Sequence, residues 1–245
     1  MSMSIGLQLY TVREELSKDF KGTLKTLSSI GFQGVEFAWN YGGMEPEELS
    51  DFLKNINLKC IGLYSPVAQI EDSGSDAYKY AEALNSPYFT SGITDKTNEA
   101  EWPGAIESIK KAAKISSSKG ITFLYHNHWQ EFEKINGKYA LDILMDETDP
   151  NLVKVELDTA WVKKGGDDPV AYIKKYAGRL PMLHVKDIDA ENNVTEIGNG
   201  VVDFPEVIKA AKESGVEWIV NEQDSSSIGA IKSAGINFNN LMNLL

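Results

Sequence analysis

The chain of 245 residues has one cysteine, three histidines and no long apolar run. A single cysteine, Cys60, excludes an intramolecular disulfide, and its apolar neighbours predict a buried structural thiol. No apolar stretch approaches the roughly twenty residues that span a bilayer, and the N-terminus lacks a basic region followed by an apolar core. These absences predict a cytoplasmic protein without membrane contact.

Basic residues are also few: 24 Lys and Arg stand against 36 Asp and Glu, for a net charge of −12. Such a chain repels nucleic acid and anionic membranes, and it has no Lys/Arg run that could form a local basic patch. No G-x-G-x-x-G follows a strand-like segment, and no G-x-x-x-x-G-K-[ST] occurs. Nucleotide-binding folds and nucleic-acid partners are therefore poor interpretations.

Strand-like and helix-like segments alternate eight times along the chain. The predicted strands are residues 5–10, 34–37, 58–64, 88–90, 121–125, 152–158, 180–185 and 217–221. Amphipathic segments such as 20–30 and 100–119 lie between them, with apolar residues at helical spacing. Parallel neighbours need crossover connections, so this alternation predicts a parallel sheet. Eight units in one domain-sized chain predict a closed (β/α)₈ TIM barrel, a single domain over residues 1–245.

Histidines and carboxylates stand at the ends of the last four predicted strands. These residues are His126, Asp158, His184 and Glu222. A barrel of this kind builds its site from such strand ends, and neighbouring strands bring them together. Imidazole with carboxylate suits Mn²⁺, Zn²⁺ or Co²⁺ better than Ca²⁺, so we predict one divalent metal ion. Simpler interpretations stay open: Asp158 as a loop cap, His126 with His128 as a structural pair, and Glu36 as a salt-bridge partner of Arg13 or of a neighbouring lysine.

Several motifs across nearly the whole chain resemble the xylose-isomerase-like TIM-barrel family of sugar phosphate isomerases and epimerases, whose superfamily includes endonuclease IV. They occupy residues 6–13, 34–37, 125–128, 156–159, 178–187, 198–204 and 221–224. The resemblance implies one metal held by Glu, Asp, His and Glu. Asp158, His184 and Glu222 match that pattern, whereas His126 stands where the family has its first glutamate. Either His126 or the nearby Glu131 is then the strand-five ligand, or the metal site is weakened.

Two further positions depart from the family pattern. Tyr64 stands where a histidine is common, and Trp161 stands where D-T-x-H has its histidine. Trp161 is open to two interpretations, as loop packing or as a platform for a sugar ring. The loops of Trp39, Trp129 and Trp161 are also candidate contacts of a homodimer.

The resemblance implies an isomerase or epimerase of a small keto-sugar or polyol, with proton transfer beside a metal-polarised carbonyl. The catalytic residues would then be Glu222, His128, Lys186 and Glu36. The substrate-binding residues would be Gln8, Tyr10, Tyr64, Glu156 and Trp161. The glycine-containing loop at 198–200 could offer backbone N–H groups to an anion, or simply form a turn.

Two alternatives compete with this activity. Tyr125-His-Asn-His128 is similar to the inosose dehydratases, which eliminate water beside a ketone, and Lys186 or His128 would then be the acid. The second alternative is a barrel that has no catalytic activity and only binds carbohydrate or serves as an assembly partner. An endonuclease for abasic DNA is a poor interpretation, because three histidines on a chain of net charge −12 cannot build the three-metal cluster that this activity needs.

Overall fold

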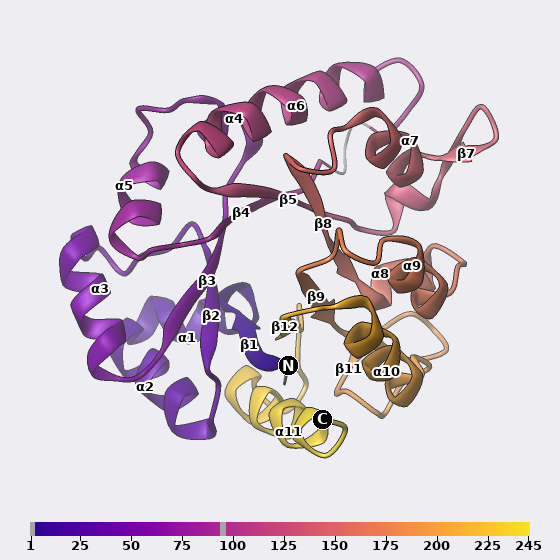
Figure 1. The fold of residues 1–245 in the computed structure, drawn as a ribbon. Helices are drawn as coiled ribbons and strands as arrows, with labels where there is room; N and C mark the ends of the chain where they lie inside the picture. The colour runs from indigo at the N-terminus through magenta and orange to yellow at the C-terminus, as the bar shows by residue number, and fades with distance from the viewer. Residues whose placement is uncertain (1–2, 94–96) are drawn as a thin grey trace.

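Eight parallel strands close into a barrel in the computed structural model, which describes residues 3–93 and 97–245 (Figure 1). The strands are β1 (Ser4–Gln8), β2 (Gly34–Ala38), β3 (Lys59–Tyr64), β4 (Tyr88–Ser91), β5 (Thr122–His126), β8 (Val153–Asp158), β9 (Met182–Val185) and β12 (Trp218–Asn221). Around the barrel their order is β1-β12-β9-β8-β5-β4-β3-β2. The predicted single-domain (β/α)₈ barrel is confirmed, and the four strands that carry the predicted metal ligands are consecutive neighbours in it.

The helices surround this barrel (Figure 1). They are α1 (Arg13–Lys18), α2 (Phe20–Ile30), α3 (Pro46–Asn55), α4 (Val67–Glu71), α5 (Asp76–Ala83), α6 (Trp102–Ser118), α7 (Ala140–Glu147), α8 (Thr159–Lys164), α9 (Pro169–Lys175), α10 (Phe204–Ser214) and α11 (Ala230–Met242). Helix α2 has the bounds that its sequence signals predict: the Asp19 side chain accepts the Gly22 N–H, and Gly31 ends the helix with a φ of 121°. Within the described residues, no helix is long and apolar enough to cross a membrane.

The interior of the barrel is filled by side chains at the end away from the predicted site. Ile61, Leu124, Met182 and Val220 form a small buried cluster there. Gly6 and Gly34 are paired across β1 and β2, and a Cβ atom on either would lie within about 2.5 Å of the Ile61 side chain. The two glycines therefore make the room that Ile61 fills, as expected for a packed barrel core.

Short elements follow several strands directly, and the sequence pattern did not reveal them. The 3₁₀ turn η1 (Leu9–Val12) begins right after β1, so the predicted strand 5–10 ends at Gln8 and Tyr10 belongs to the turn. Helix α8 likewise begins at the end of β8. The turn η2 (Gln130–Phe132) and two small hairpins, β6 (Lys134–Ile135) with β7 (Lys138–Tyr139) and β10 (Asp187–Ile188) with β11 (Val194–Thr195), lie after β5 and β9. Of these segments, η1 contributes Tyr10 to the cavity at the mouth of the barrel.

Candidate active site and metal centre

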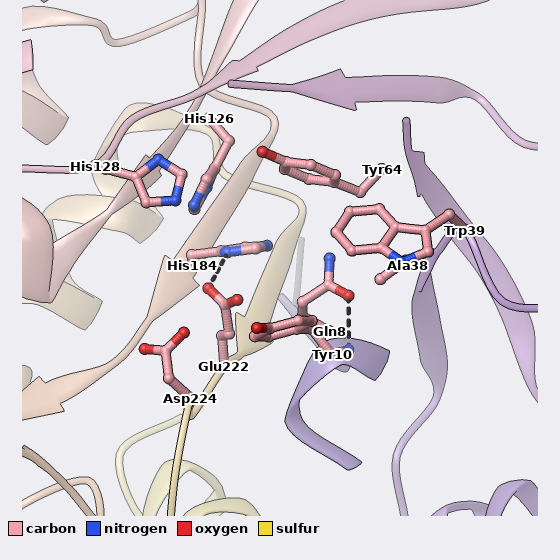
Figure 2. Close-up of a pocket in the computed structure, with 10 residues that line it drawn as sticks. All are labelled: Gln8, Tyr10, Ala38, Trp39, Tyr64, His126, His128, His184, Glu222 and Asp224. Carbon is pink, nitrogen blue, oxygen red and sulfur yellow. Dashed lines mark hydrogen bonds and ion pairs between the residues drawn. The ribbon is translucent and has the colours of Figure 1, made fainter. Parts of the chain in front are cut away.

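A cavity of about 270 Å³ opens at the carboxyl ends of the strands (Figure 2). Its walls are formed by Gln8, Tyr10, Ala38, Trp39, Tyr64, His126, His128, His184, Glu222 and Asp224. Most of these were predicted site residues, but Ala38, Trp39 and Asp224 were not. Asp224 could have been found, because it stands two positions after Glu222, as His128 stands two positions after His126.

Four predicted metal ligands converge at the floor of this cavity, and all of them except Asp158 line it. His126, Asp158, His184 and Glu222 are buried, and each offers a ligand atom within 4.8 Å of the others. Asp158 and His184 are register partners on β8 and β9, which sets their side chains next to each other. Asp158 is also a cap, since its Oδ1 accepts the Trp161 N–H at 3.0 Å. One oxygen thus begins helix α8, and the other faces the cluster.

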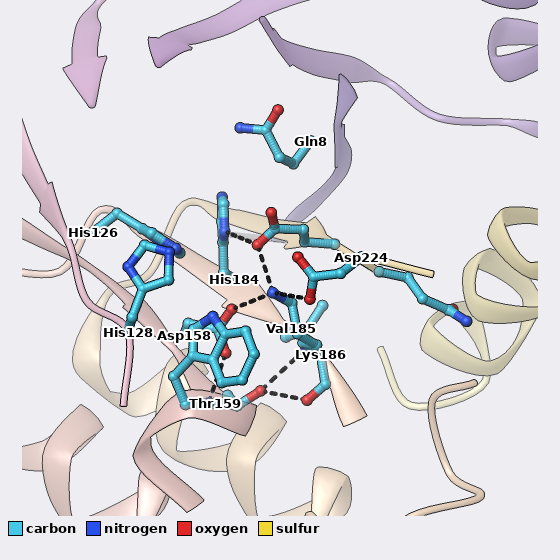
Figure 3. A network of polar contacts seen from close by, with 12 residues as sticks. Gln8, His126, His128, Asp158, Thr159, His184, Val185, Lys186 and Asp224 are labelled. Carbon is cyan, nitrogen blue, oxygen red and sulfur yellow. Dashed lines mark hydrogen bonds and ion pairs between the residues drawn. The ribbon is translucent and has the colours of Figure 1, made fainter. Parts of the chain in front are cut away.

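Lys186 lies beside the cluster and is surrounded by carboxylates (Figure 3). Its Nζ is 2.9 Å from Asp224 Oδ2, 3.0 Å from Glu222 Oε2 and 3.3 Å from Asp158 Oδ2. Burial opposes the charge of Lys186, but Asp158, Glu222 and Asp224 raise its pKa above the ordinary value. The same charge, with His184, keeps the pKa of Glu222 well below its usual range although burial raises it. Lys186 is 1% exposed and does not line the cavity.

His184 is held by carboxylates on both sides of its ring. Nδ1 lies 3.0 Å from Glu222 Oε2, and Nε2 lies 2.9 Å from Glu36 Oε2 and 3.1 Å from Glu156 Oε1. Gln8 Nε2 donates a second hydrogen bond to Glu36 Oε2, at 2.7 Å. A partner on Nε2 fixes the tautomer and the orientation of a histidine that binds metal through its other nitrogen.

Glu36 and Glu156 therefore lie behind His184 and away from the cavity. Both are completely buried and neither lines the cavity wall, so the positions of Glu36 and Glu156 favour contact with His184 over the catalytic role predicted for Glu36 and the substrate contact predicted for Glu156. Burial and the nearby Glu36 raise the pKa of Glu156 to about 8. The alternative salt bridge of Glu36 is also absent from the described contacts, because Arg13 donates to the backbone oxygens of Tyr10 and Asp224.

Glu131, the alternative strand-five ligand, has a different function in the structure. Its Oε1 accepts the Tyr125 hydroxyl at 2.7 Å, and its Oε2 accepts the His128 N–H at 3.0 Å. Burial raises the pKa of Glu131 to about 7. Both oxygens are used to hold the loop after β5, and Glu131 is not part of the buried cluster. His126 is the residue that β5 brings to the cluster.

His128 lines the cavity and is supported from behind by Trp161. The two rings are stacked, with centroids 6.0 Å apart and an angle of 28° between their planes. Burial lowers the pKa of His128 to about 4, so the imidazole is neutral near pH 7. Trp161 does not line the cavity, and Lys186 Nζ lies 4.5 Å from its ring centroid. The packing interpretation of Trp161 therefore fits its position, and the substrate platform does not.

The glycine loop at 198–200 is a turn around a buried carboxylate. Asp187 Oδ2 accepts the N–H groups of Gly198 and Gly200, each at 2.9 Å, and its Oδ1 accepts that of Val202 at 3.2 Å. A Cβ atom at Gly200 would lie 2.2 Å from the Ile188 carbonyl oxygen. Because Asp187 already occupies these donors, the loop does not offer them to an external anion.

Known proteins share this fold and parts of this sequence. An inosose dehydratase from Clostridium beijerinckii is 30% identical over 146 residues, which are 52% of this chain and 48% of the relative. The chain thus spans about half the length of the curated relatives that it matches. A sugar phosphate isomerase/epimerase from Parabacteroides distasonis superposes with a TM-score of 0.84 at 22% identity, over 98% of this chain and 94% of that one.

The structure of the IolI protein with a bound zinc atom has a TM-score of 0.80 at 12% identity, over 99% of this chain and 97% of the other. At these identities the solved structures show the fold alone. The family model described as "Xylose isomerase-like TIM barrel" matches residues 24–238, which is most of the chain. This chain therefore belongs to the xylose isomerase-like TIM barrel family.

Proposed function

We propose that this protein is a divalent-metal-dependent enzyme that removes a proton beside the carbonyl of a small keto-carbohydrate and then eliminates water. The observation that carries the proposal is the position of one free imidazole, His128, in the cavity above the buried cluster of His126, Asp158, His184 and Glu222. The inosose dehydratase and sugar isomerase/epimerase names among the similar proteins support a keto-carbohydrate as the substrate.

The four cluster residues fit a divalent transition metal ion. His126 Nδ1 and Asp158 Oδ2 are buried and have no hydrogen-bond partner among the described residues, although Lys186 Nζ lies 3.3 Å from that oxygen. Buried polar atoms normally have a partner, so these two atoms suit a bound cation. Two imidazoles and two carboxylates are a donor set for Mn²⁺, Zn²⁺ or Co²⁺, and the zinc atom of the IolI structure supports zinc as one candidate. Such an ion, when bound, would polarise the carbonyl oxygen of the substrate.

We assign the proton transfer to His128. Its neutral ring can accept the proton from the carbon beside the carbonyl, while the electron pair of that C–H bond forms the new C=C bond. The imidazolium then returns the proton to the hydroxyl on the next carbon, whose C–O bond breaks, and water leaves. The stacked Trp161 holds the ring in place for both steps.

Lys186 was predicted as a catalytic acid, and its contacts favour a different role. Its ammonium group is paired with three carboxylates and does not reach the cavity wall. In this proposal it fixes Asp158, Glu222 and Asp224 and offsets part of their charge. Gln8, Tyr10 and Tyr64 line the cavity and remain the residues that we expect to contact the substrate.

Isomerisation or epimerisation, the first interpretation of the sequence, is the second candidate. Glu222 favours it, because its carboxylate lines the same cavity as His128 (Figure 2). One of the two groups could remove a proton from the substrate and the other could return one to the same or the next carbon. Elimination ranks first because it needs only one group that accepts and then returns a proton.

The test is product analysis with the Mn²⁺-loaded protein in D₂O, on a keto-inositol and a set of ketohexoses. Elimination removes both the proton beside the carbonyl and a hydroxyl, with an absorbing conjugated ketone and a mass lower by one water. Epimerisation leaves the elements of the sugar unchanged and adds solvent deuterium. We expect the His128→Gln variant to bind metal as the wild type does and to lose turnover.

Metal content decides between both reactions and a barrel that only binds carbohydrate. We expect near-stoichiometric Mn, Zn or Co in the wild type by elemental analysis, and its loss in His126→Ala and in Glu222→Ala. A wild-type protein that binds no metal after reloading, and that exchanges no substrate proton, would instead leave the binding-only barrel.

A further inference from the structure

We propose that the outer part of the cavity is a second subsite, in which Trp39, Tyr64 and Tyr10 bind a non-reacting ring of the substrate. The substrate would then be a two-ring molecule, a keto-sugar joined through a glycosidic bond to another sugar or to an aromatic group. This inference rests on the proposed function, because that function places the reacting carbon beside His128.

Trp39 has a backbone conformation that core packing does not explain. Its φ is 44°, and the Asn40 N–H donates to the Ala38 carbonyl oxygen, which closes a three-residue turn with Trp39 at its centre. A bulky residue with positive φ costs roughly 1–3 kcal/mol, and such residues cluster at functional sites. The side chain is 54% exposed, so little burial offsets that cost. What the turn does achieve is to place the indole on the cavity wall (Figure 2).

The three aromatic rings lie further out than the metal cluster. The His126 ring is 5.9 Å from Tyr64, and Tyr64 is 5.7 Å from Trp39, both measured between centroids. Figure 2 shows Tyr64 between His126 and Trp39, with Asp224 on the opposite side of the cavity. One aromatic ring therefore separates Trp39 from the cluster. A substrate that reaches both ends of the cavity has to extend beyond a single sugar ring.

Tyr10 completes the subsite and is fixed by Arg13. Its ring centroid is 6.2 Å from that of Trp39, and the Arg13 guanidinium lies 4.1 Å from the centre of the tyrosine ring. Arg13 also donates to the backbone oxygens of Tyr10 and Asp224, at 2.8 and 3.0 Å. Arg13 thus holds Tyr10 in place before a ligand arrives, which reduces the entropy cost of binding at this side of the subsite.

The chemistry of the subsite suits a ring that the metal cluster does not hold. Indole and phenol rings offer a broad apolar face with a polar edge, and a sugar ring or an aromatic group can stack on such a face. Charged groups meet at the other end of the cavity, where Glu222 and Asp224 lie. This division predicts recognition of the reacting sugar by polar groups and of the second ring by stacking.

Trp129 provides a matched control within the same chain. It is also exposed, at 36%, but it does not line the cavity, and Lys164 Nζ lies 5.5 Å from its ring. The informative variant is Trp39→Gly, because glycine adopts positive φ without strain, which offsets part of the stability lost with the indole contacts and with the more flexible unfolded chain. A melting curve of that variant, recorded beside the binding measurement, separates loss of binding from unfolding.

The experiment compares binding of glucose, cellobiose and phenyl β-glucoside by calorimetry, and it needs no turnover. We expect the two-ring probes to bind the wild type and Trp129→Ala about tenfold more tightly than glucose, and Trp39→Gly to lose that preference. A preference for cellobiose alone would identify a second sugar, and one for the phenyl glucoside alone an aromatic group. Because these probes carry no ketone, the ring preference can hold even if the proposed reaction fails.

Three results would overturn the inference. The first is equal affinity for glucose and both two-ring probes in the wild type. The second is a dimerisation role for Trp39. It would be shown by a wild-type homodimer in light scattering that dissociates in Trp39→Gly, together with no preference of the wild type for two-ring probes. Trp39 would then be covered by a second copy of the chain. An unchanged preference in Trp39→Gly would equally remove Trp39 from the subsite.

Discussion

The contact between Glu36 and His184 gives the sharpest expectation about metal binding. Glu36 Oε2 lies 2.9 Å from His184 Nε2 and accepts a hydrogen bond from Gln8 at 2.7 Å. In Glu36→Gln the shape of the side chain is kept, but the acceptor is neutral, and its single oxygen has to serve both donors. We expect His184 to be held less firmly and to be a weaker ligand through its other nitrogen.

The magnitude follows from the hydrogen bonds involved. A hydrogen bond to a charged group contributes about 1.5–3 kcal/mol, and one between neutral groups about 0.5–1.5 kcal/mol. The difference, roughly 1–1.5 kcal/mol, corresponds to about a tenfold loss of metal affinity. Glu156 Oε1 lies 3.1 Å from the same nitrogen and can replace Glu36 in part. We therefore expect about tenfold for Glu36→Gln and about a hundredfold for Glu36→Gln with Glu156→Gln.

A competition titration of Zn²⁺ or Mn²⁺ against a chromophoric chelator measures this loss directly. The control is Glu47→Gln, an exposed carboxylate on α3. Glu36 and Glu156 are the buried partners of His184 Nε2, so removing both acidic groups also costs stability. The melting temperature of the metal-free double variant is therefore measured beside its metal affinity, and the titration is run well below that temperature. Wild-type affinity in the double variant would refute the role of Glu36 and Glu156 in positioning His184.

Three further expectations concern stability and reactivity. Burial raises the pKa of Glu131 to about 7. The stability that Glu131 contributes is therefore complete below about pH 4.5 and is lost as pH rises through 7. Between these pH values the unfolding free energy of the wild type, measured with urea, should fall by up to about 3 kcal/mol more than that of Glu131→Gln. Ile61→Ala should lower the free energy of unfolding by about 2–5 kcal/mol, because Gly6 and Gly34 have no side chains to fill the space. Cys60 is partly exposed, but burial of its thiol raises the pKa to about 12, so a thiol reagent at pH 8 should react with it only slowly before unfolding.

The sequence was sufficient to predict the barrel and the convergence of its chemistry. Eight alternating segments identified the fold, and the fold itself implies that strand ends meet at one mouth. His126, Asp158, His184 and Glu222 were therefore predicted together without any knowledge of their distances. Depth along a strand was harder to predict than the face to which a side chain points. Glu156 shares a face with Asp158, two residues later on β8, but it lies deeper and contacts the back of His184, as Glu36 of β2 does.

Local geometry at the mouth was less predictable, since it depends on contacts between distant segments. The positive φ of Trp39 has no signal in the sequence, where glycine or asparagine is the usual residue for such a turn. The two acceptor oxygens of Glu131 are matched by Tyr125 and the His128 backbone, so a carboxylate that looked like a ligand is a support for the loop.

The charges explain why the cluster combines histidines with a lysine. Glu36, Glu156, Asp158 and Glu222 are all buried around His184, and so many carboxylates would repel one another in the absence of cations. Lys186 offsets charge on one side, and His126 stands where the resemblance implies a further glutamate. A fifth carboxylate at position 126 would add to this repulsion, since His126 Nδ1 is only 4.0 Å from Glu156 Oε2. The neutral imidazole at position 126 and the buried acidic side chain at 156 are therefore compatible with each other. We expect the single variant His126→Glu to be less stable than the wild type, and the double variant His126→Glu with Glu156→Leu to recover that loss.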